Sequence, residues 1–207
     1  MFAEIVTSSI QKANKGVQTR ASIVAAAMHV AGRDGLKGIT IGGVADRINM
    51  SKSGVFAHFG SREDLQIAVV EKYHEDFEAQ VFLPAMQATR GVARVNALFS
   101  QWIERVGQEI DSGCIYISGA VEFDEHPGAV RDALVTMVQT WQAAVARAVK
   151  LAQTLGHLSD AVAPEQIAFE LHGIVLALHH DARFLKLQGS TDRAQTAFNR
   201  LIKFYTV

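Results

Sequence analysis

The sequence has few of the residues that mark several common classes of protein. Among its 207 residues there is one cysteine, and 20 Lys and Arg are balanced by 21 Asp and Glu. The lone Cys114 excludes an internal disulfide framework and fits a reducing compartment. The longest apolar run in the C-terminal half, GIVLAL, is far short of a membrane span. The N-terminus shows no charged segment followed by an apolar core, so we expect a cytoplasmic protein with no membrane partner.

Motifs of the common catalytic sites are also missing. The chain contains no G-x-S-x-G, H-E-x-x-H, Walker or G-x-G-x-x-G motif and no paired C-x-x-C. We therefore assign no catalytic residue and no cofactor, and we expect that the protein is not an enzyme. An all-α enzyme that binds a small molecule stays as an alternative, which turnover by the purified protein would support.

Two polar groups have the composition of a metal site but not its spacing. In FDEHPG, residues 123–128, the two acids and the histidine are adjacent, so their side chains point in different directions. The proline that follows them starts a helix, and acids suit that end electrostatically. A looser group lies in one predicted helix: His172, His179, His180 and Asp181. We favour solvent-facing or interface histidines over a bound metal and assign no metal ligand.

What the chain does have is apolar residues that recur at three- and four-residue spacing. The segments RVNALFSQWIERV and VRDALVTMVQTWQAAVARAV each place them along one stripe, and no alternation of period two is sustained. Each of the three prolines falls where a helical pattern restarts. The fold is therefore predicted to be all-α, with about nine helices. They span residues 19–34, 40–48, 52–58, 61–80, 89–110, 113–124, 127–155, 164–187 and 191–205.

Charge is distributed unevenly along the chain. Residues 1–65 carry eight Lys or Arg and five Asp or Glu, a net +3. The remainder carries twelve and sixteen, a net −4. A basic N-terminal part on an acidic body suits a protein that touches phosphate at one end only.

Two short helices in the basic part have the spacing of a helix-turn-helix motif. Thr40 is a good N-cap for the first helix and Ser51 for the second, and about three residues separate them. On the second helix, Val55 and Phe59 are four apart and are expected to face the core. Recognition helices meet base edges with their N-terminal residues. The predicted DNA-binding residues, of which the last two are expected at phosphate, are Thr40, Lys52, Ser53, Gly54, Phe56, His58 and Arg62.

The run TRASIVAAAMHVAGRDGLKGITIGGVADRINMSKSGVFAHFGSREDL, residues 19–65, resembles the DNA-binding domain of the TetR family of bacterial transcriptional repressors. The resemblance implies a three-helix DNA-binding head at 19–65 and a larger helical ligand-binding and dimerisation body at 66–207, after a flexible segment at 1–18. Phe56 stands where the family commonly has a tyrosine that contacts phosphate. Its ring offers only apolar contact, for example to a thymine methyl group.

The resemblance also implies the function. It suggests a ligand-responsive repressor that binds a palindromic operator in double-stranded DNA as a homodimer and is released by a small-molecule effector. The predicted ligand-binding residues are Phe77, Phe99, Trp102, Cys114, Tyr116, Phe123, Met137, Trp141 and His172. The predicted dimer interface lies on the last two helices and consists of Leu171, Ile174, Val175, Leu178, Phe198, Leu201, Ile202 and Tyr205.

Two alternatives to these interpretations stay open. The last two helices could pack within one subunit instead of forming a dimer interface. The chain could also be a helical dimerisation or adaptor module that no longer binds DNA, because Phe56 and Ala57 lack polar reach. A DNA-binding assay across salt concentrations separates a DNA-binding regulator from such an adaptor, since phosphate-driven binding weakens as salt rises.

Overall fold

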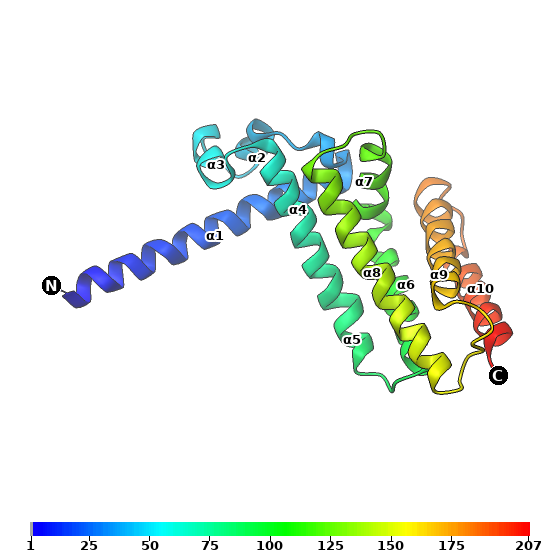
Figure 1. Cartoon of the computed structure of the whole chain (residues 1–207). Coiled ribbons are helices and arrows are strands. Elements are labelled where there is room, and N and C mark those ends of the chain that lie inside the picture. Colours follow the sequence, from blue (N-terminus) through cyan, green and yellow to red (C-terminus); the bar gives the residue numbers. More distant parts are fainter. Residues whose placement is uncertain (1) are drawn as a thin grey trace.

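In a computed structural model of the chain, the backbone is described for residues 2–207 and the side chains for residues 15–207. Figure 1 shows a head built from the end of α1 with α2 and α3, and a body of longer helices. Within the described part, ten α-helical segments occur, and α5 continues α4, which leaves nine separate helices. The all-α prediction is confirmed. None of the described helices combines the length and the apolar character needed to cross a membrane.

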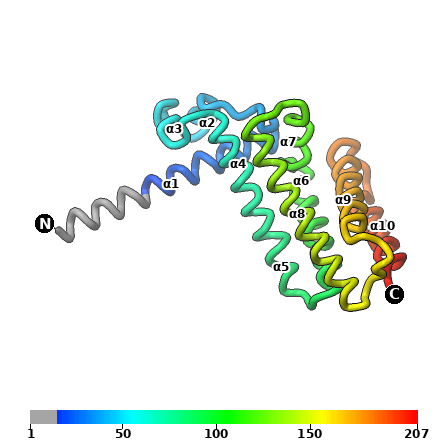
Figure 2. The backbone as a smooth tube through the Cα atoms, viewed as in Figure 1, coloured from blue at the N-terminus to red at the C-terminus, as the bar shows by residue number. Residues whose placement is uncertain are grey.

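The helices follow one another in the order drawn in Figures 1 and 2. They are α1 (Phe2–Asp34), α2 (Ile41–Arg47), α3 (Lys52–Phe59), α4 (Arg62–Phe77), α5 (Leu83–Met86), α6 (Val92–Ser112), α7 (Ile115–Phe123), α8 (Ala129–Thr154), α9 (Pro164–His179) and α10 (Ser190–Tyr205). A 3-10 turn, η1 (Leu36–Gly38), joins α1 to α2, and two π-helical segments, η2 (Glu78–Phe82) and η3 (His180–Phe184), follow α4 and α9.

The observed helices differ from the predicted ones at two places. Residues 15–18 belong to α1, and most of the predicted flexible segment lies outside the residues whose side chains are described. Pro84 does not restart a helix, because α4, η2 and α5 run on continuously. In η2 the amide of Leu83 donates to the carbonyl of Glu78, one residue further back than in an α-helix. This wider turn lets the chain stay helical at a proline that has no amide to donate.

The body packs around α8, which contacts α4, α6, α7 and α9. In Figure 1, α4, α6 and α8 run along one another, and α9 and α10 stand together at the opposite edge from the head. The apolar stripe of α6 is buried here, with Val95, Leu98 and Val106 all nearly inaccessible. Helix spacing of three and four residues thus identified the buried stripe correctly.

Candidate nucleic-acid interface and helical body

The turn between α2 and α3 is stabilised by two capping residues. Thr40 Oγ1 accepts from the amide of Gly43, and Ser51 Oγ accepts from the amide of Gly54, each at 3.0 Å. Asn49 between the helices has φ of 53°, a left-handed conformation that asparagine tolerates. Each cap satisfies an amide that the first turn of its helix leaves free. The predicted helix-turn-helix geometry is confirmed.

The head has a small aliphatic core. Val44 and Ala45 of α2 and Val55 of α3 are completely buried, as are Ile23 and Ala27 of α1. Small side chains allow α2 and α3 to cross closely. Helix α1 packs against the same core. Because α3 buries this face, its other face points out of the molecule.

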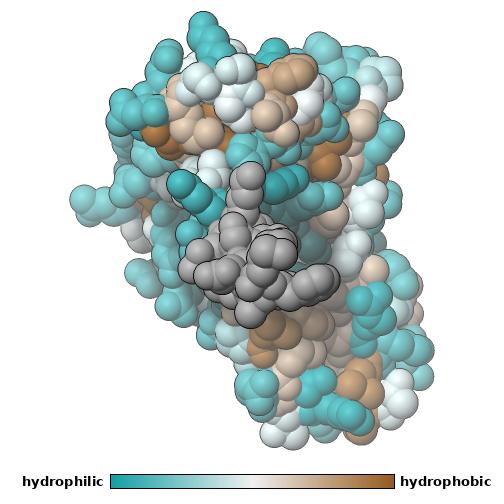
Figure 3. Space-filling model, turned by 90° about the vertical axis from the view of Figure 1, so that its left-hand side faces the viewer, coloured by the Kyte–Doolittle hydropathy of each residue, from teal (hydrophilic) through white to brown (hydrophobic). Residues whose placement is uncertain are grey.

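The outward face of α3 carries most of the predicted DNA-binding residues. Lys52 and Ser53 are exposed at its N-terminal end, Phe56 is 56% exposed one turn later, and His58 is half-buried near the end. Gly54 is half-buried beside the cap, where an added Cβ would lie 3.1 Å from Ser51 Oγ and 3.2 Å from Met50 Cε. Figure 3 views this side and shows apolar and intermediate residues at the top of the molecule, rimmed by hydrophilic ones.

A glycine on α2 makes room for the lysine of α3. A Cβ at Gly42 would lie 2.9 Å from Cε of Lys52, so the lysine stem runs over the place where another residue would have its side chain. A glycine within a helix costs about 1 kcal/mol relative to alanine, and here the end of the Lys52 side chain occupies the space beside it. The stem of Lys52 is thereby held against α2 while the residue stays exposed.

Arg62 is placed differently from the expectation of a free phosphate-binding side chain. Its Nε donates to the carbonyl of Ile39 at 2.7 Å, and its Nη2 donates to the carbonyl of Lys37. Gln66, one turn further along α4, donates to the carbonyl of Leu36 at 2.7 Å. Both side chains therefore hold the connection between α1 and α2 against α4. The guanidinium of Arg62 thus helps to fix the shape of the head, and the residue stays exposed.

A carboxylate of the body holds the same connection from the other side. Glu122 of α7 accepts from the amides of Leu36 at 3.0 Å and Lys37 at 2.7 Å. Gly35 has φ of 78°, and an added Cβ would lie 2.3 Å from the Glu122 carboxylate. Only glycine suits this position, for both reasons. The sequence offered no signal for Glu122, which lies 86 residues from Leu36 along the chain.

The head also touches the body where α1 meets the end of α6. A Cβ at Gly32 would lie 2.0 Å from the carbonyl oxygen of Ser112, and one at Gly113 would lie 2.3 Å from the carbonyl oxygen of Gly32. Arg183 of η3 donates to the carbonyl of Ile110 at 2.6 Å and to that of Gly32 at 3.3 Å. The head is thus joined to α4, α6, α7 and η3 by direct contacts.

Several predicted ligand-binding residues form a filled aromatic cluster in the body. Phe77, Trp102 and Trp141 pack edge to face, with centroids 4.8 to 6.3 Å apart. His172 lies 5.5 Å from the Trp102 ring, and its Nδ1 and the Nε1 of Trp141 are buried without a hydrogen-bond partner. Phe99 lies apart from them, stacked on Phe198 of α10 at 3.9 Å.

Two other predicted ligand-binding residues line a cleft between α7 and α8. This cleft has a volume of about 280 Å³, and Tyr116 and Phe123 form part of its wall with Leu134 and Val138. Arg131 also lines it and supplies a charged group. Met137 of α8, which is also a predicted ligand-binding residue, is half-buried and packs against the hydrophobic core. A mostly apolar wall with few polar groups is the usual form of a small-molecule site.

The remaining predicted ligand-binding residue, Cys114, belongs to a buried polar network. Glu109 Oε1 accepts from Arg105 Nε at 2.7 Å and from the Tyr73 hydroxyl, which also lies 3.2 Å from Cys114 Sγ. His179 Nε2 lies 3.3 Å from Glu109 Oε2. Burial opposes ionisation of Glu109, but hydrogen bonds from His179, Tyr73 and Arg105 outweigh it and hold the pKa of this carboxyl below its usual range.

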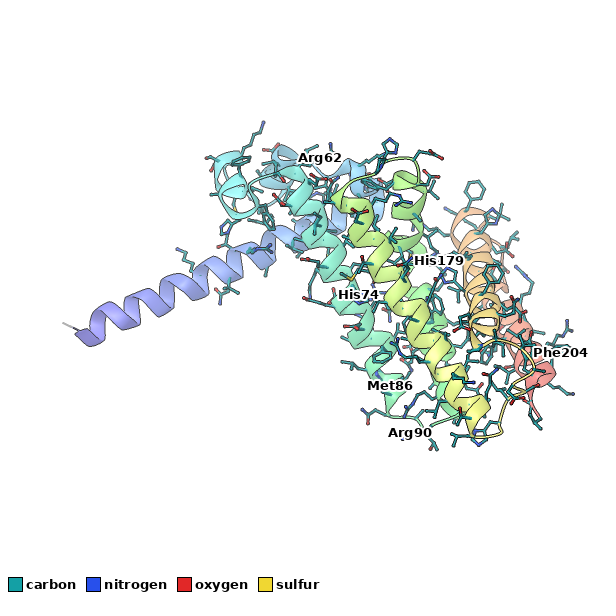
Figure 4. The ribbon with its side chains drawn as sticks, viewed as in Figure 1. Arg62, His74, Met86, Arg90, His179 and Phe204 are labelled. Atoms are coloured by element: carbon teal, nitrogen blue, oxygen red, sulfur yellow. The ribbon has the colours of Figure 1, made fainter. Side chains whose placement is uncertain are left out.

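Most of the predicted dimer-interface residues are buried inside the single chain. Leu171, Val175, Leu178, Phe198, Ile202 and Tyr205 have little accessible surface. Three residues of the predicted set, Ile174, Leu178 and Leu201, line an open groove between α9 and α10, which also includes Gly173, Ala177 and Phe204. Phe204 is 79% exposed and lies at the outer edge of α10 in Figure 4. The apolar stripe read from the sequence is the side of these helices that faces their own core.

An all-helical chain with a capped helix-turn-helix head and a larger helical body defines the class of helix-turn-helix transcriptional regulators. Residues 23–69 match the family model described as bacterial regulatory proteins, tetR family. Residues 91–198 match that of the tetracyclin repressor-like C-terminal domain. The chain therefore belongs to the TetR family of bacterial regulatory proteins.

Solved structures show the same fold over nearly the whole chain. A TetR transcriptional regulator from Chloroflexus aurantiacus J-10-FL is 19% identical, covering 92% of this chain and 96% of its own, with a TM-score of 0.81. The TetR family regulator from Cytophaga hutchinsonii is 17% identical over 93% and 97%, with a TM-score of 0.82. AibR, solved with isovaleryl coenzyme A and operator DNA, is 20% identical over 90% and 97%, with a TM-score of 0.67. A search of curated proteins finds no match.

Proposed function

We propose that the protein is a homodimeric transcriptional repressor that binds a palindromic operator in double-stranded DNA and leaves it when a small-molecule effector binds the body. The observation that carries this proposal is the outward face of α3. It presents Lys52 and Ser53 at the N-terminal end of a helix whose opposite face is fixed in the head core. The complex of AibR with isovaleryl coenzyme A and operator DNA supports a chain of this fold binding both partners.

The proposed dimer forms through the groove between α9 and α10. Ile174, Leu201 and Phe204 would supply the apolar contacts, and Gly173 and Ala177 allow two helices to approach closely. A two-fold dimer would present two α3 helices to successive major grooves, about 34–36 Å apart. One head offers few phosphate contacts, so two linked heads are needed for tight binding.

The proposed effector site is the cleft between α7 and α8. Phe123 of α7 lines the cleft, and its neighbour Glu122 holds the amides of Leu36 and Lys37 in the head. A ligand that shifts α7 would therefore move the connection between α1 and α2. Ligand binding would favour a head spacing that no longer fits successive grooves, and operator affinity would fall by population shift.

The test is a selection of bound fragments from random duplex DNA, followed by binding measurements on the enriched sequence. We expect a palindromic product and an affinity that falls steeply with salt. Lys52→Ala should weaken binding by about fivefold or more, because a good lysine contact to a base contributes roughly 1–3 kcal/mol. Lys150→Ala, an exposed lysine on α8 far from the head in sequence, is the matched control and should leave affinity unchanged. Equal binding by both variants would remove Lys52 from the DNA-binding surface.

A further inference from the structure

We infer that Glu109, Cys114 and His179 form a binding site for one divalent metal ion of the Zn²⁺ class. Their ligand atoms, a carboxylate oxygen, the sulfur and a ring nitrogen, lie within 4.8 Å of one another. No other group of three such side chains in the described part of the chain comes as close. The three come from α6, the α6–α7 connection and the end of α9, so the fold and not the sequence brings them together.

The donor set and its dimensions suit Zn²⁺ better than a harder ion. Sulfur, imidazole nitrogen and carboxylate oxygen are ligands of zinc, whereas magnesium and calcium take oxygen. Zinc bonds of about 2.0–2.3 Å place tetrahedral ligands about 3.3–3.8 Å apart. His179 Nε2 and Glu109 Oε2 already lie 3.3 Å apart. A side-chain adjustment of about 1 Å brings the sulfur of Cys114 into the same shell, and water completes it.

The surroundings orient the carboxylate ligand. Arg105 and Tyr73 hydrogen bond to Glu109, which keeps the carboxylate ionised and oriented. Cys114 is the N-cap residue of α7, and its buried thiol stays protonated until an ion binds. Binding replaces the S–H bond by a metal–sulfur bond, and the proton leaves to solvent. His179 binds as neutral imidazole through Nε2, with its proton on Nδ1.

Of the three ligands, His179 borders a pocket of about 840 Å³ between the end of α6, α7, η3 and the start of α10, which Asp111 also lines. Figure 4 shows His179 within the body, among the helices that surround this network. Without the ion, burial raises the pKa of the Cys114 thiol to about 12. The free thiol is therefore unreactive, which argues against a redox role for the same residue.

The site also touches the joint between body and head. Cys114 follows Gly113, whose Cα packs on the carbonyl of Gly32 in α1. Arg183, one turn after His179, donates to the carbonyls of Gly32 and Ile110. An ion that draws Cys114 towards His179 would act directly on this joint. This consequence for operator affinity depends on the proposed function, whereas metal binding itself does not.

Titration of the intact, metal-free protein with Co²⁺ tests the site without DNA. We expect one Co²⁺ per chain with a thiolate-to-cobalt charge-transfer absorption, displaced by Zn²⁺. The chain has one cysteine, so this absorption can report only Cys114. Absence of the absorption at saturating Co²⁺ would overturn the inference and leave the network with a structural role only.

Matched histidine variants locate the nitrogen ligand. His179→Gln should weaken Co²⁺ binding by at least tenfold, whereas His180→Gln, at the exposed neighbouring position, should bind like the parent. Equal binding by both variants would contradict the assignment.

Thermal unfolding supplies a second readout, because an ion that binds only the folded chain raises Tm. Zn²⁺ should raise the Tm of the parent and not that of Cys114→Ser, and an equal shift in both would contradict the site.

Discussion

The head and the body bury side chains of different kinds. The head core is made of small aliphatic residues, and its charged side chains lie at the surface or bond to backbone carbonyls. The body buries a carboxylate, Glu109, that is only 3% exposed, together with His179 and a cluster of large aromatic rings. Buried ionic groups contribute little net stability. The difference indicates that the core of the head serves to fix its shape, whereas the interior of the body also holds ionisable groups.

The largest effect is expected from removing the buried carboxylate. Glu109→Ala leaves the largely buried Arg105 without its carboxylate partner, so the free energy of unfolding should fall by about 3–5 kcal/mol. Glu104→Ala, an exposed residue on the same helix, should change it by less than about 0.5 kcal/mol. Chemical denaturation measures both. A small loss for Glu109→Ala would mean that the body does not depend on its polar network.

The next effect concerns the joint between the two regions. Gly32→Ala forces a Cβ to within 2.0 Å of the Ser112 carbonyl oxygen, so α1 and α6 must separate. We expect a loss of about 1–3 kcal/mol in the free energy of unfolding. Gly107→Ala on α6 meets nothing within 4 Å and should stabilise the chain by about 0.5–1 kcal/mol. Losses of equal size in both variants would contradict the close crossing.

A smaller effect, confined to the head, is expected at a helix cap. Ser51→Ala removes the acceptor for the amide of Gly54 and should cost about 1 kcal/mol. Amide exchange should quicken in α3 and not in the body helices. Thr136→Ala, whose hydroxyl only bonds to the carbonyl of Asp132 within α8, is the control with little effect. Faster exchange throughout the chain would show that head and body unfold as one unit.

The smallest effect concerns protonation in the body. Burial lowers the pKa of His172 below its ordinary value near 6.5, and its Nδ1 has no partner. Its contribution to stability is therefore complete above pH 6.5 and is lost as pH falls, since the unfolded chain takes up the proton first. The loss from one group cannot exceed about 1.4 kcal/mol per pH unit. His172→Gln should flatten the dependence of the free energy of unfolding on pH below pH 6.5. An unchanged dependence would exclude His172 as its source.

Local sequence patterns predicted the head well. The capping residues Thr40 and Ser51 and the spacing of Val55 and Phe59 are short-range signals, and the structure has them as expected. The bonds of Arg62 to the carbonyls of Lys37 and Ile39 could not be predicted, because these acceptors become its neighbours only after folding.

Contacts between distant segments could not be predicted from the sequence. Periodicity finds the most apolar stripe of a helix, and on α9 and α10 that stripe faces the chain's own core, so it identified Leu171 and Phe198 as interface residues. The polar network joins Glu109 to His179 across 70 positions. His179 was seen only with its sequence neighbours His180 and Asp181, which lie outside the network. No local pattern records such a pairing.

Binding of the intact protein to double-stranded DNA at low salt, with Lys52→Ala measured beside the parent, decides whether α3 reads DNA. We expect the parent to select a two-fold symmetric sequence and the variant to lose at least about fivefold in affinity. Failure of the parent to bind any duplex, or binding that is indifferent to Lys52, would contradict the assignment of α3 as the recognition helix.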